Sequence, residues 1–131
     1  MAKASHLLFS SDHVYVRPQG LEADIGLSHF GQDHLSRVTV IDLPPTGQLL
    51  HRGDLLATVE AIKVTVELVA PVSGVVIAVN DQVRADPWRV NTDPYGSGWL
   101  VRVRLTDPAE VSDLLDEETY RVSATWAPHI L

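Results

Sequence analysis

The sequence contains no cysteine among its 131 residues and only two lysines. Without cysteine the chain can form neither a disulfide nor a thiolate metal site, so any thiol chemistry must come from an added cofactor. Long apolar runs are also missing, and the patch Leu7, Leu8 and Phe9 is too short for a secretory signal or a membrane span. These absences predict a cytoplasmic protein that does not enter a membrane.

Positive charge is scarce as well, since ten basic residues stand against seventeen acidic ones and leave a formal net charge of −7. Such a charge repels phosphate backbones and disfavours anionic membranes, which argues against nucleic-acid and membrane partners. It favours association with basic faces on partner proteins.

The basic residues are almost all arginine. Apart from Lys3 near the N-terminus, Lys63 is the only lysine in the chain. A lysine amine can be acylated, whereas a guanidinium stays protonated and is a poor acylation target. Lys63 is therefore a candidate for covalent modification, although codon bias and chance would produce the same count.

Short apolar runs alternate with turn signals along most of the chain, which predicts a mostly β protein. Strands are expected at residues 13–16, 22–27, 38–41, 55–61, 64–69, 75–79 and 99–105. In the last of these, Leu100 and two arginines should lie on one face and Val101, Val103 and Leu105 on the other. Prolines and glycines predict a long loop over residues 84–98. No linker divides the chain, so one domain over residues 1–131 is expected.

Two helices are predicted from their start signals. A serine that can cap the first turn opens a short helix over residues 28–36. Near the C-terminus, Asp107 as N-cap, Pro108 at the first helical position and Glu110 two positions later predict a helix over residues 107–117. The tail beyond this helix is only weakly patterned.

The expected strands 55–61 and 64–69 have almost nothing between them, which predicts a tight hairpin with its tip at Ile62 and Lys63. A charged side chain at such a tip points into water, where a modifying enzyme can reach it. The paired strands fix the base of the side chain, as a swinging arm requires, and tethering raises the effective concentration of the cargo at each partner site. A plain solvated lysine in a turn is the alternative interpretation.

The stretch Glu60-Ala61-Ile62-Lys63 is followed by an acidic residue four positions after the lysine and then by Pro-Val-Ser-Gly. Further motifs are found at residues 12–13, 42–44, 53–54, 67, 70–74, 79–81, 91–99 and 107–120. Together these motifs resemble the glycine cleavage H protein family over roughly residues 9–120. The resemblance implies a β-sandwich of the barrel-sandwich hybrid type with a lysine on an exposed hairpin.

By this resemblance, Lys63 carries lipoate in an amide, and the chain is a carrier without catalytic residues or a bound metal. The lipoyl dithiolane would supply the thiol–disulfide chemistry that the chain itself lacks. Partner enzymes are expected to recognise the residues around the arm, namely Glu60, Ala61, Ile62, Val64 and Glu67. For the two glutamates, simple solubility of the hairpin is an equal alternative.

Several positions depart from the family pattern. The family's usual Trp after its Glu-His pair is absent, since Val14 and Tyr15 follow His13. The family's Leu-Gly-Asp reads Leu35-Ser36-Arg37, which reverses a charge. Positive charge is also added by Arg84, Arg89, Arg102 and Arg104. Because the carrier motifs are kept while surface residues differ, altered partners are indicated.

The altered residues resemble, at residues 13–18, 85–87 and 93–96, the H-like lipoate-binding proteins of heterodisulfide reductase-like bacterial sulfur oxidation. This resemblance makes sulfur oxidation the favoured pathway, with a heterodisulfide reductase-like complex and a sulfurtransferase as partners. The alternative is the H protein of the glycine cleavage system, which carries the aminomethyl group between glycine decarboxylase, aminomethyltransferase and dihydrolipoyl dehydrogenase. Either pathway requires a lipoate–protein ligase or lipoyl transferase, and a small carrier that visits several partners is expected to be a monomer.

Two other classes fit less well. The biotinyl motif Glu-Ala-Met-Lys-Met is similar to this hairpin, but Ile62 and Val64 replace both methionines, and Lys63 is far from either end of the chain. A metal or hydrolytic enzyme is disfavoured because the six histidines are scattered and no serine lies in a nucleophile elbow. His13 is expected to have a structural or partner-contact role.

Overall fold

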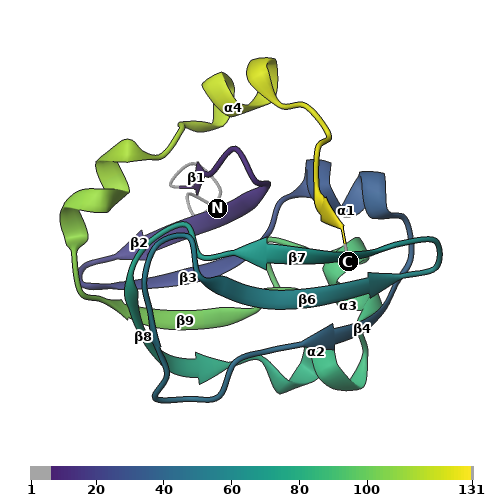
Figure 1. Ribbon diagram of the computed structural model, residues 1–131, viewed down its shortest axis with the longest axis horizontal. Coiled ribbons are helices and arrows are strands. Elements are labelled where there is room, and N and C mark those ends of the chain that lie inside the picture. Colours follow the sequence, from purple (N-terminus) through teal and green to yellow (C-terminus); the bar gives the residue numbers. More distant parts are fainter. Residues whose placement is uncertain (1–6, 131) are drawn as a thin grey trace.

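The computed structural model describes residues 7–130, which form two antiparallel sheets flanked by short helices (Figure 1). The first sheet has the order β1 (Leu8–Phe9), β2 (Val14–Gln19), β3 (Glu22–Leu27), β9 (Val101–Leu105), β8 (Gly74–Val79) and β5 (Leu49–Leu50). The second has the order β10 (His129–Ile130), β7 (Thr65–Val69), β6 (Leu55–Ala61) and β4 (Val38–Asp42). The predicted mostly β sandwich is confirmed, and the two-residue strands β1, β5 and β10 are additions to it.

The core lies between the sheets. In β7 and β9 every second residue is buried, as the pleat requires, whereas the first four residues of β2 are all buried. In β9, Val101, Val103 and Leu105 are buried, while the arginines between them lie toward solvent. Leu100, which was predicted to share a face with these arginines, differs from them in being buried. This residue precedes β9, its N–H donates to the Ile25 carbonyl at 2.9 Å, and its side chain is fully buried.

The first predicted helix is confirmed as α1 (His29–Leu35). The Ser28 side chain caps it by accepting a hydrogen bond from the Gly31 N–H at 3.0 Å. The helix ends at Ser36, which adopts a positive φ of 62°.

The predicted helix over residues 107–117 is wrong in kind and in position. Residues Pro108–Asp113 form a 3-10 helix, η2, and the α-helix α4 (Glu117–Ser123) begins only afterwards. Glu110 does not complete a capping box, because its carboxylate accepts hydrogen bonds from the N–H and hydroxyl of Ser73, at 2.6 and 3.0 Å. The cap that starts α4 is Asp116, which accepts from the Thr119 N–H at 2.8 Å.

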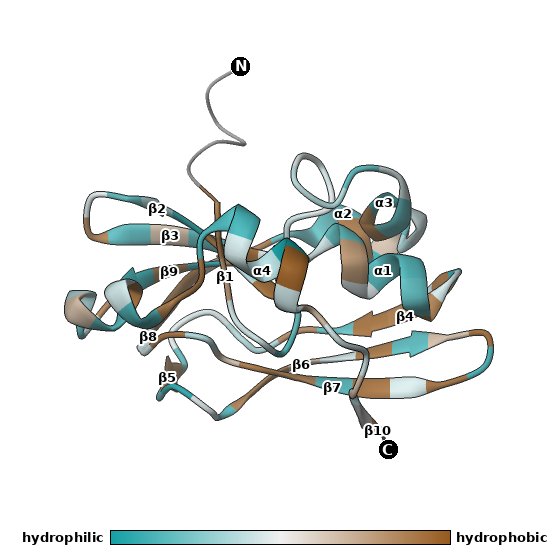
Figure 2. Cartoon of the chain, turned by 90° about the horizontal axis from the view of Figure 1, so that it is seen from above, coloured by the Kyte–Doolittle hydropathy of each residue, from teal (hydrophilic) through white to brown (hydrophobic). Residues whose placement is uncertain are grey.

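The predicted loop over residues 84–98 overlaps the end of a short helix, α2 (Asp81–Ala85), and contains a second one, α3 (Trp88–Thr92). Asn80 caps α2 through its side chain, and Pro87 stands just before α3, where its missing N–H costs no hydrogen bond. Figure 2 shows α1, α2 and α3 grouped at the end of the molecule where β6 turns into β7.

The C-terminal segment returns to the second sheet. Strand β10 pairs with β7 through the registers His129↔Glu67 and Ile130↔Val66. The strand that leaves the β6–β7 turn is therefore hydrogen-bonded on both edges. No helix within residues 7–130 is long and apolar enough to cross a membrane.

Candidate functional site

The predicted hairpin tip is confirmed by the backbone. Strands β6 and β7 are paired up to Glu60↔Thr65, and the N–H of Ala61 donates to the Val64 carbonyl at 2.8 Å. This bond closes the chain around Ile62 and Lys63.

The turn is also hydrogen-bonded to the start of the neighbouring strand, β4, and to the residue before it. The N–H of Ile62 donates to the Arg37 carbonyl at 3.1 Å, and the Thr39 hydroxyl donates to the Glu60 carbonyl at 3.2 Å. Arg37 directly precedes β4 and Thr39 lies within it, so the turn is held by the β4 side as well as by its pairing with β7.

Lys63 is exposed, and its amine forms no hydrogen bond or ion pair with any of residues 7–130. A fixed backbone therefore carries a long, freely rotating side chain that ends in an amine. Such an amine is open to acylation, and the group attached to it could sweep through the surrounding solvent.

The residues predicted to surround the arm occupy three different positions in the structure. Glu60 and Ile62 are exposed beside Lys63, and the Ile62 side chain keeps 66% of its surface accessible. Ala61 and Val64 are half-buried and pack against the core. Glu67 lies further along β7.

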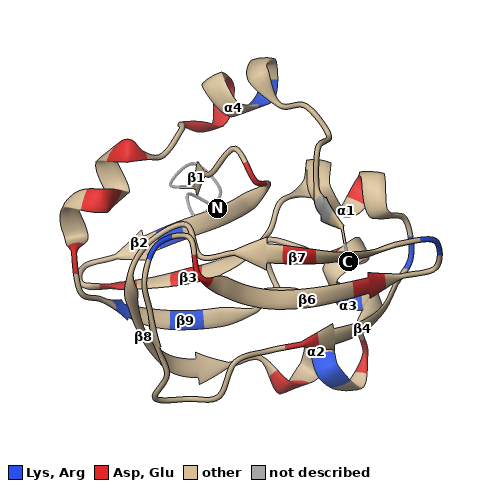
Figure 3. Ribbon diagram, in the orientation of Figure 1, with Lys and Arg blue, Asp and Glu red and all other residues tan. Residues whose placement is uncertain are grey.

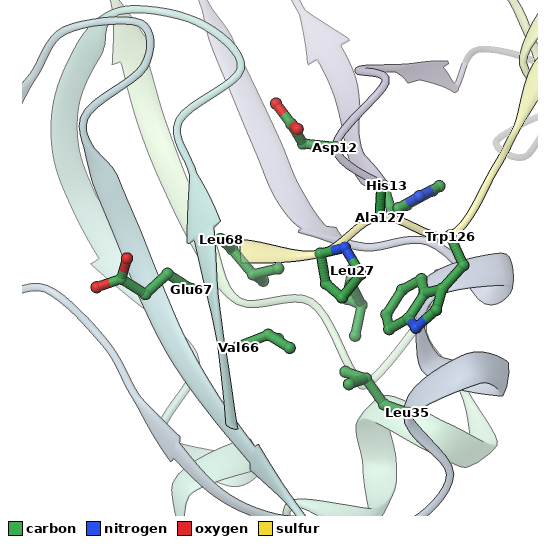
Figure 4. Close-up of a pocket in the computed structure, with 10 residues that line it drawn as sticks. Asp12, His13, Leu27, Leu35, Val66, Glu67, Leu68, Trp126 and Ala127 are labelled. Carbon is green, nitrogen blue, oxygen red and sulfur yellow. The ribbon is translucent and has the colours of Figure 1, made fainter. Parts of the chain in front are cut away.

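The two glutamates share the outer face of the hairpin. Glu60 pairs with Thr65 and Glu67 pairs with Thr58, and side chains alternate along each strand, so all four lie on the face opposite buried Val59. Figure 4 shows the Glu67 carboxylate directed away from the interior side of β7. An enzyme that approaches this outer face would meet both carboxylates.

A second cluster, centred on buried His13, was not recognised as a unit in the sequence. Its Nε2 lies 2.7 Å from the Thr125 carbonyl and its Nδ1 lies 2.7 Å from the Tyr120 hydroxyl. Since a carbonyl only accepts, Nε2 carries the proton and Nδ1 of the neutral ring accepts from Tyr120. The Tyr120 oxygen in turn accepts from the Ser28 hydroxyl at 2.7 Å. The cap of α1 is thus linked to α4 and to the C-terminal segment.

The C-terminal segment also covers the side of β7 that faces the protein interior. Trp126 stacks on His34 with ring centroids 5.1 Å apart and lies 5.5 Å from the His13 ring. Figure 4 shows Trp126 and Ala127 over the hollow lined by Leu27, Leu35 and Val66. Within the described part of the chain, no group of three or more His, Asp or Glu residues is placed to hold a metal ion.

Burial makes His13 a source of pH dependence. Desolvation lowers the pKa of His13 below its ordinary 6.5, against the opposing effects of the Thr125 carbonyl and Asp12. Near that pH the folded chain binds fewer protons than the unfolded chain, so the His13 contribution to stability is fully present above about pH 6.5. It is lost as the pH falls toward the folded-state pKa.

We therefore expect the free energy of unfolding in urea to be lower near pH 5.5 than near pH 7.5. His13→Asn is the matched variant, because His13 has a φ of 71°, a region that asparagine tolerates, and asparagine does not titrate. An unchanged pH dependence in His13→Asn would show that other groups cause it.

The comparisons with known proteins agree with one another. A family model described as Glycine cleavage H-protein matches residues 7–125, which leaves Trp126 and the residues after it outside the match. A glycine cleavage system H protein from Bacillus cytotoxicus is 39% identical over 120 residues, covering 92% of this chain and 94% of the relative. Glycine cleavage system H protein 1 from Caldanaerobacter subterraneus subsp. tengcongensis is 44% identical over 115 residues, covering 88% and 91%. The crystal structure of an H protein from Mycobacterium marinum superimposes with a TM-score of 0.82 at 29% identity, covering 90% of this chain and 95% of that one.

Proposed function

The chain belongs to the glycine cleavage H-protein family, whose members are non-catalytic carriers with lipoate attached to a lysine, and we propose that Lys63 is that lysine here. The observation that carries this proposal is the exposed, unpaired amine of Lys63 on a turn whose backbone is held by β6, β7 and the Arg37 carbonyl. We further propose that residues 1–131 form one carrier domain.

The chain's own contribution is to hold the base of the arm still. Once attached, lipoate would supply thiol–disulfide exchange, which a cysteine-free chain cannot perform. Amide formation also removes the charge of Lys63. Glu60 and Ile62 flank the amine and are the residues that a lipoate–protein ligase or lipoyl transferase would touch first. Glu67 would contact only a partner that extends along β7.

We propose that the pathway is glycine cleavage, with glycine decarboxylase, aminomethyltransferase and dihydrolipoyl dehydrogenase as partners. The names of the relatives support this choice over the sulfur-oxidation role that the sequence had favoured. A second observation weakens the argument for a sulfur-oxidation partner. Three of the four added arginines are paired with neighbouring carboxylates and present no unpaired charge: Arg84 with Asp81 at 2.7 Å, Arg89 with Asp86 at 3.7 Å and Arg102 with Asp24 at 2.7 Å.

One experiment tests both the site and the pathway. Intact-mass measurement of the protein from its native host, followed by peptide mapping, is expected to place one lipoyl group on Lys63. The lipoylated chain should then support the glycine decarboxylase exchange reaction, whereas the unmodified chain should not. A lipoylated chain that accepts sulfur from a sulfurtransferase and supports no exchange would contradict the pathway and restore the heterodisulfide reductase-like alternative. The cytoplasmic location and the monomeric state stay predictions.

A further inference from the structure

We propose that Arg37 and Trp88 form a docking ledge beside Lys63, and that this ledge binds a carboxylate on the rim of the partner enzyme that receives the arm. The proposal rests on the proposed function, because it takes Lys63 as the point from which the arm extends. We call these two side chains the Arg37–Trp88 ledge.

The ledge lies next to the arm. The Arg37 carbonyl accepts the N–H of Ile62, and Lys63 is the next residue along the chain. Figure 3 shows basic residues both at the β6–β7 tip and in the adjoining connection from α1 to β4. An enzyme that encloses the Lys63 side chain must therefore approach Arg37 as well.

The backbone around Arg37 is held rigidly. Ser36 has a φ of 62° and a ψ of −142°, a conformation that residues other than glycine rarely adopt. The side chain of Asn91 holds both neighbours of Arg37, since it accepts from the Val38 N–H at 2.9 Å and donates to the Ser36 carbonyl. Asn91 belongs to α3, the same helix that begins with Trp88. The two parts of the ledge are thus fixed relative to each other, which lowers the entropic cost of binding.

The side chains of the ledge are paired with each other and are otherwise open. The guanidinium carbon of Arg37 lies 4.7 Å from the centre of the Trp88 ring, and 41% of the Trp88 surface is exposed. Stacking on a ring leaves the edge N–H groups of a guanidinium free to bind a carboxylate in a bidentate manner. Arg37 forms no ion pair with any of residues 7–130, unlike the three paired arginines described above.

Charge complementarity selects an acidic partner. Once lipoylation has neutralised Lys63, Arg37 is the unpaired positive charge next to the arm, while the whole chain is strongly negative. Asp33 lines the same hollow as Arg37 and Trp88, and Glu60 lies on the outer face of the hairpin. A partner carboxylate is therefore attracted at Arg37 and repelled at the positions around it, so the ledge sets both the affinity and the orientation of docking.

The test compares lipoylated full-length variants in the glycine decarboxylase exchange reaction, with the carrier as the varied substrate. For Arg37→Glu we expect the KM for the carrier to rise by about tenfold or more while kcat stays within about twofold, because docking is weakened and the chemistry is untouched. Trp88→Ala should raise KM in the same direction. The wild-type KM should increase with salt, and this increase should be reduced in Arg37→Glu.

Arg104→Glu is the matched control, because Arg104 is exposed on β9 in the other sheet and the change in charge is identical. Its KM should stay within about twofold of the wild-type value. Equal KM values for Arg37→Glu and Arg104→Glu would overturn the ledge while leaving the proposed function intact. Thermal unfolding checks that each variant is folded, and Arg37→Gln replaces Arg37→Glu if the latter is not.

A wild-type chain that is lipoylated but supports no exchange would refute the proposed pathway separately. The same variants are then compared for the rate of lipoate attachment by a lipoate–protein ligase, whose active site must also admit Lys63 past Arg37. A slower rate in Arg37→Glu alone would support the ledge, and equal rates in both variants would overturn it.

Discussion

Replacing Lys63 by arginine is expected to abolish lipoate attachment completely and to leave the fold intact. The guanidinium is a poor acylation target, so the variant retains the charge of the residue and loses the reactive amine. The fold should not change, because the Lys63 side chain is exposed and makes no polar contact with residues 7–130. Coexpression with a lipoate–protein ligase, followed by intact-mass measurement, should show no lipoylated product, and support of glycine decarboxylase exchange should fall to background.

The chain offers a matched control, since Lys3 is its only other lysine. Lys3→Arg should be lipoylated to the same extent as the wild type. Lipoate found on the Lys63→Arg chain would refute the assignment, and peptide mapping would show whether Lys3 carries it. Detection of biotin on the wild-type lysine by streptavidin binding would instead favour the biotin-carrier alternative.

The largest loss of stability is expected for Phe9→Ala. Phe9 is only 1% exposed, its ring stacks on Tyr120 with centroids 4.4 Å apart, and its edge-on contact with Tyr95 spans 6.3 Å. Its backbone also exchanges two hydrogen bonds of 2.8 Å with Leu115. Truncating a buried phenylalanine leaves a cavity and usually costs about 3–5 kcal/mol. In a chain of this size that loss should lower the Tm by about 10 °C or more.

Phe30→Ala is the control for this prediction. Phe30 is also aromatic and stacks on His13 at 4.8 Å, but it lies on α1 and is only half-buried. We expect it to lose less than about half as much free energy, because its side chain already keeps part of its contact with water. Urea unfolding followed by circular dichroism measures both values. Equal losses of free energy in the two variants would show that the contact between Phe9 and α4 contributes no more to stability than the contacts of Phe30.

The two clusters that these predictions probe lie at different places and have different roles. The Phe9 and His13 contacts hold β1, α1, α4 and the C-terminal segment together, whereas the Arg37–Trp88 ledge and the β6–β7 turn face outward. Changes in the first cluster should therefore alter stability and pH dependence. Changes at the second should alter modification and docking while the fold remains.

The features that could be predicted from the sequence are those produced by neighbouring residues. The hairpin tip follows from two apolar runs with almost no gap, α1 follows from a serine cap, and the buried face of β9 follows from strict alternation. In each case the interaction that decides the structure spans only a few positions, so a local pattern is enough. The assignment of the lipoyl group to Lys63 also comes from a contiguous motif, through the resemblance, and stays a prediction.

Only the tertiary structure decided the features that depend on distant partners. Glu110 has the right spacing to cap a helix, but Ser73 lies 37 positions away and takes both of its oxygens. His13 and Thr125 are 112 positions apart, and Arg37 meets Trp88 because Asn91 binds the segment around Arg37. Arg102 likewise pairs with Asp24, 78 positions away, so a count of charges overstated how much positive surface the chain presents. Such contacts arise when packing brings separate segments together, and no local periodicity records which segments will meet.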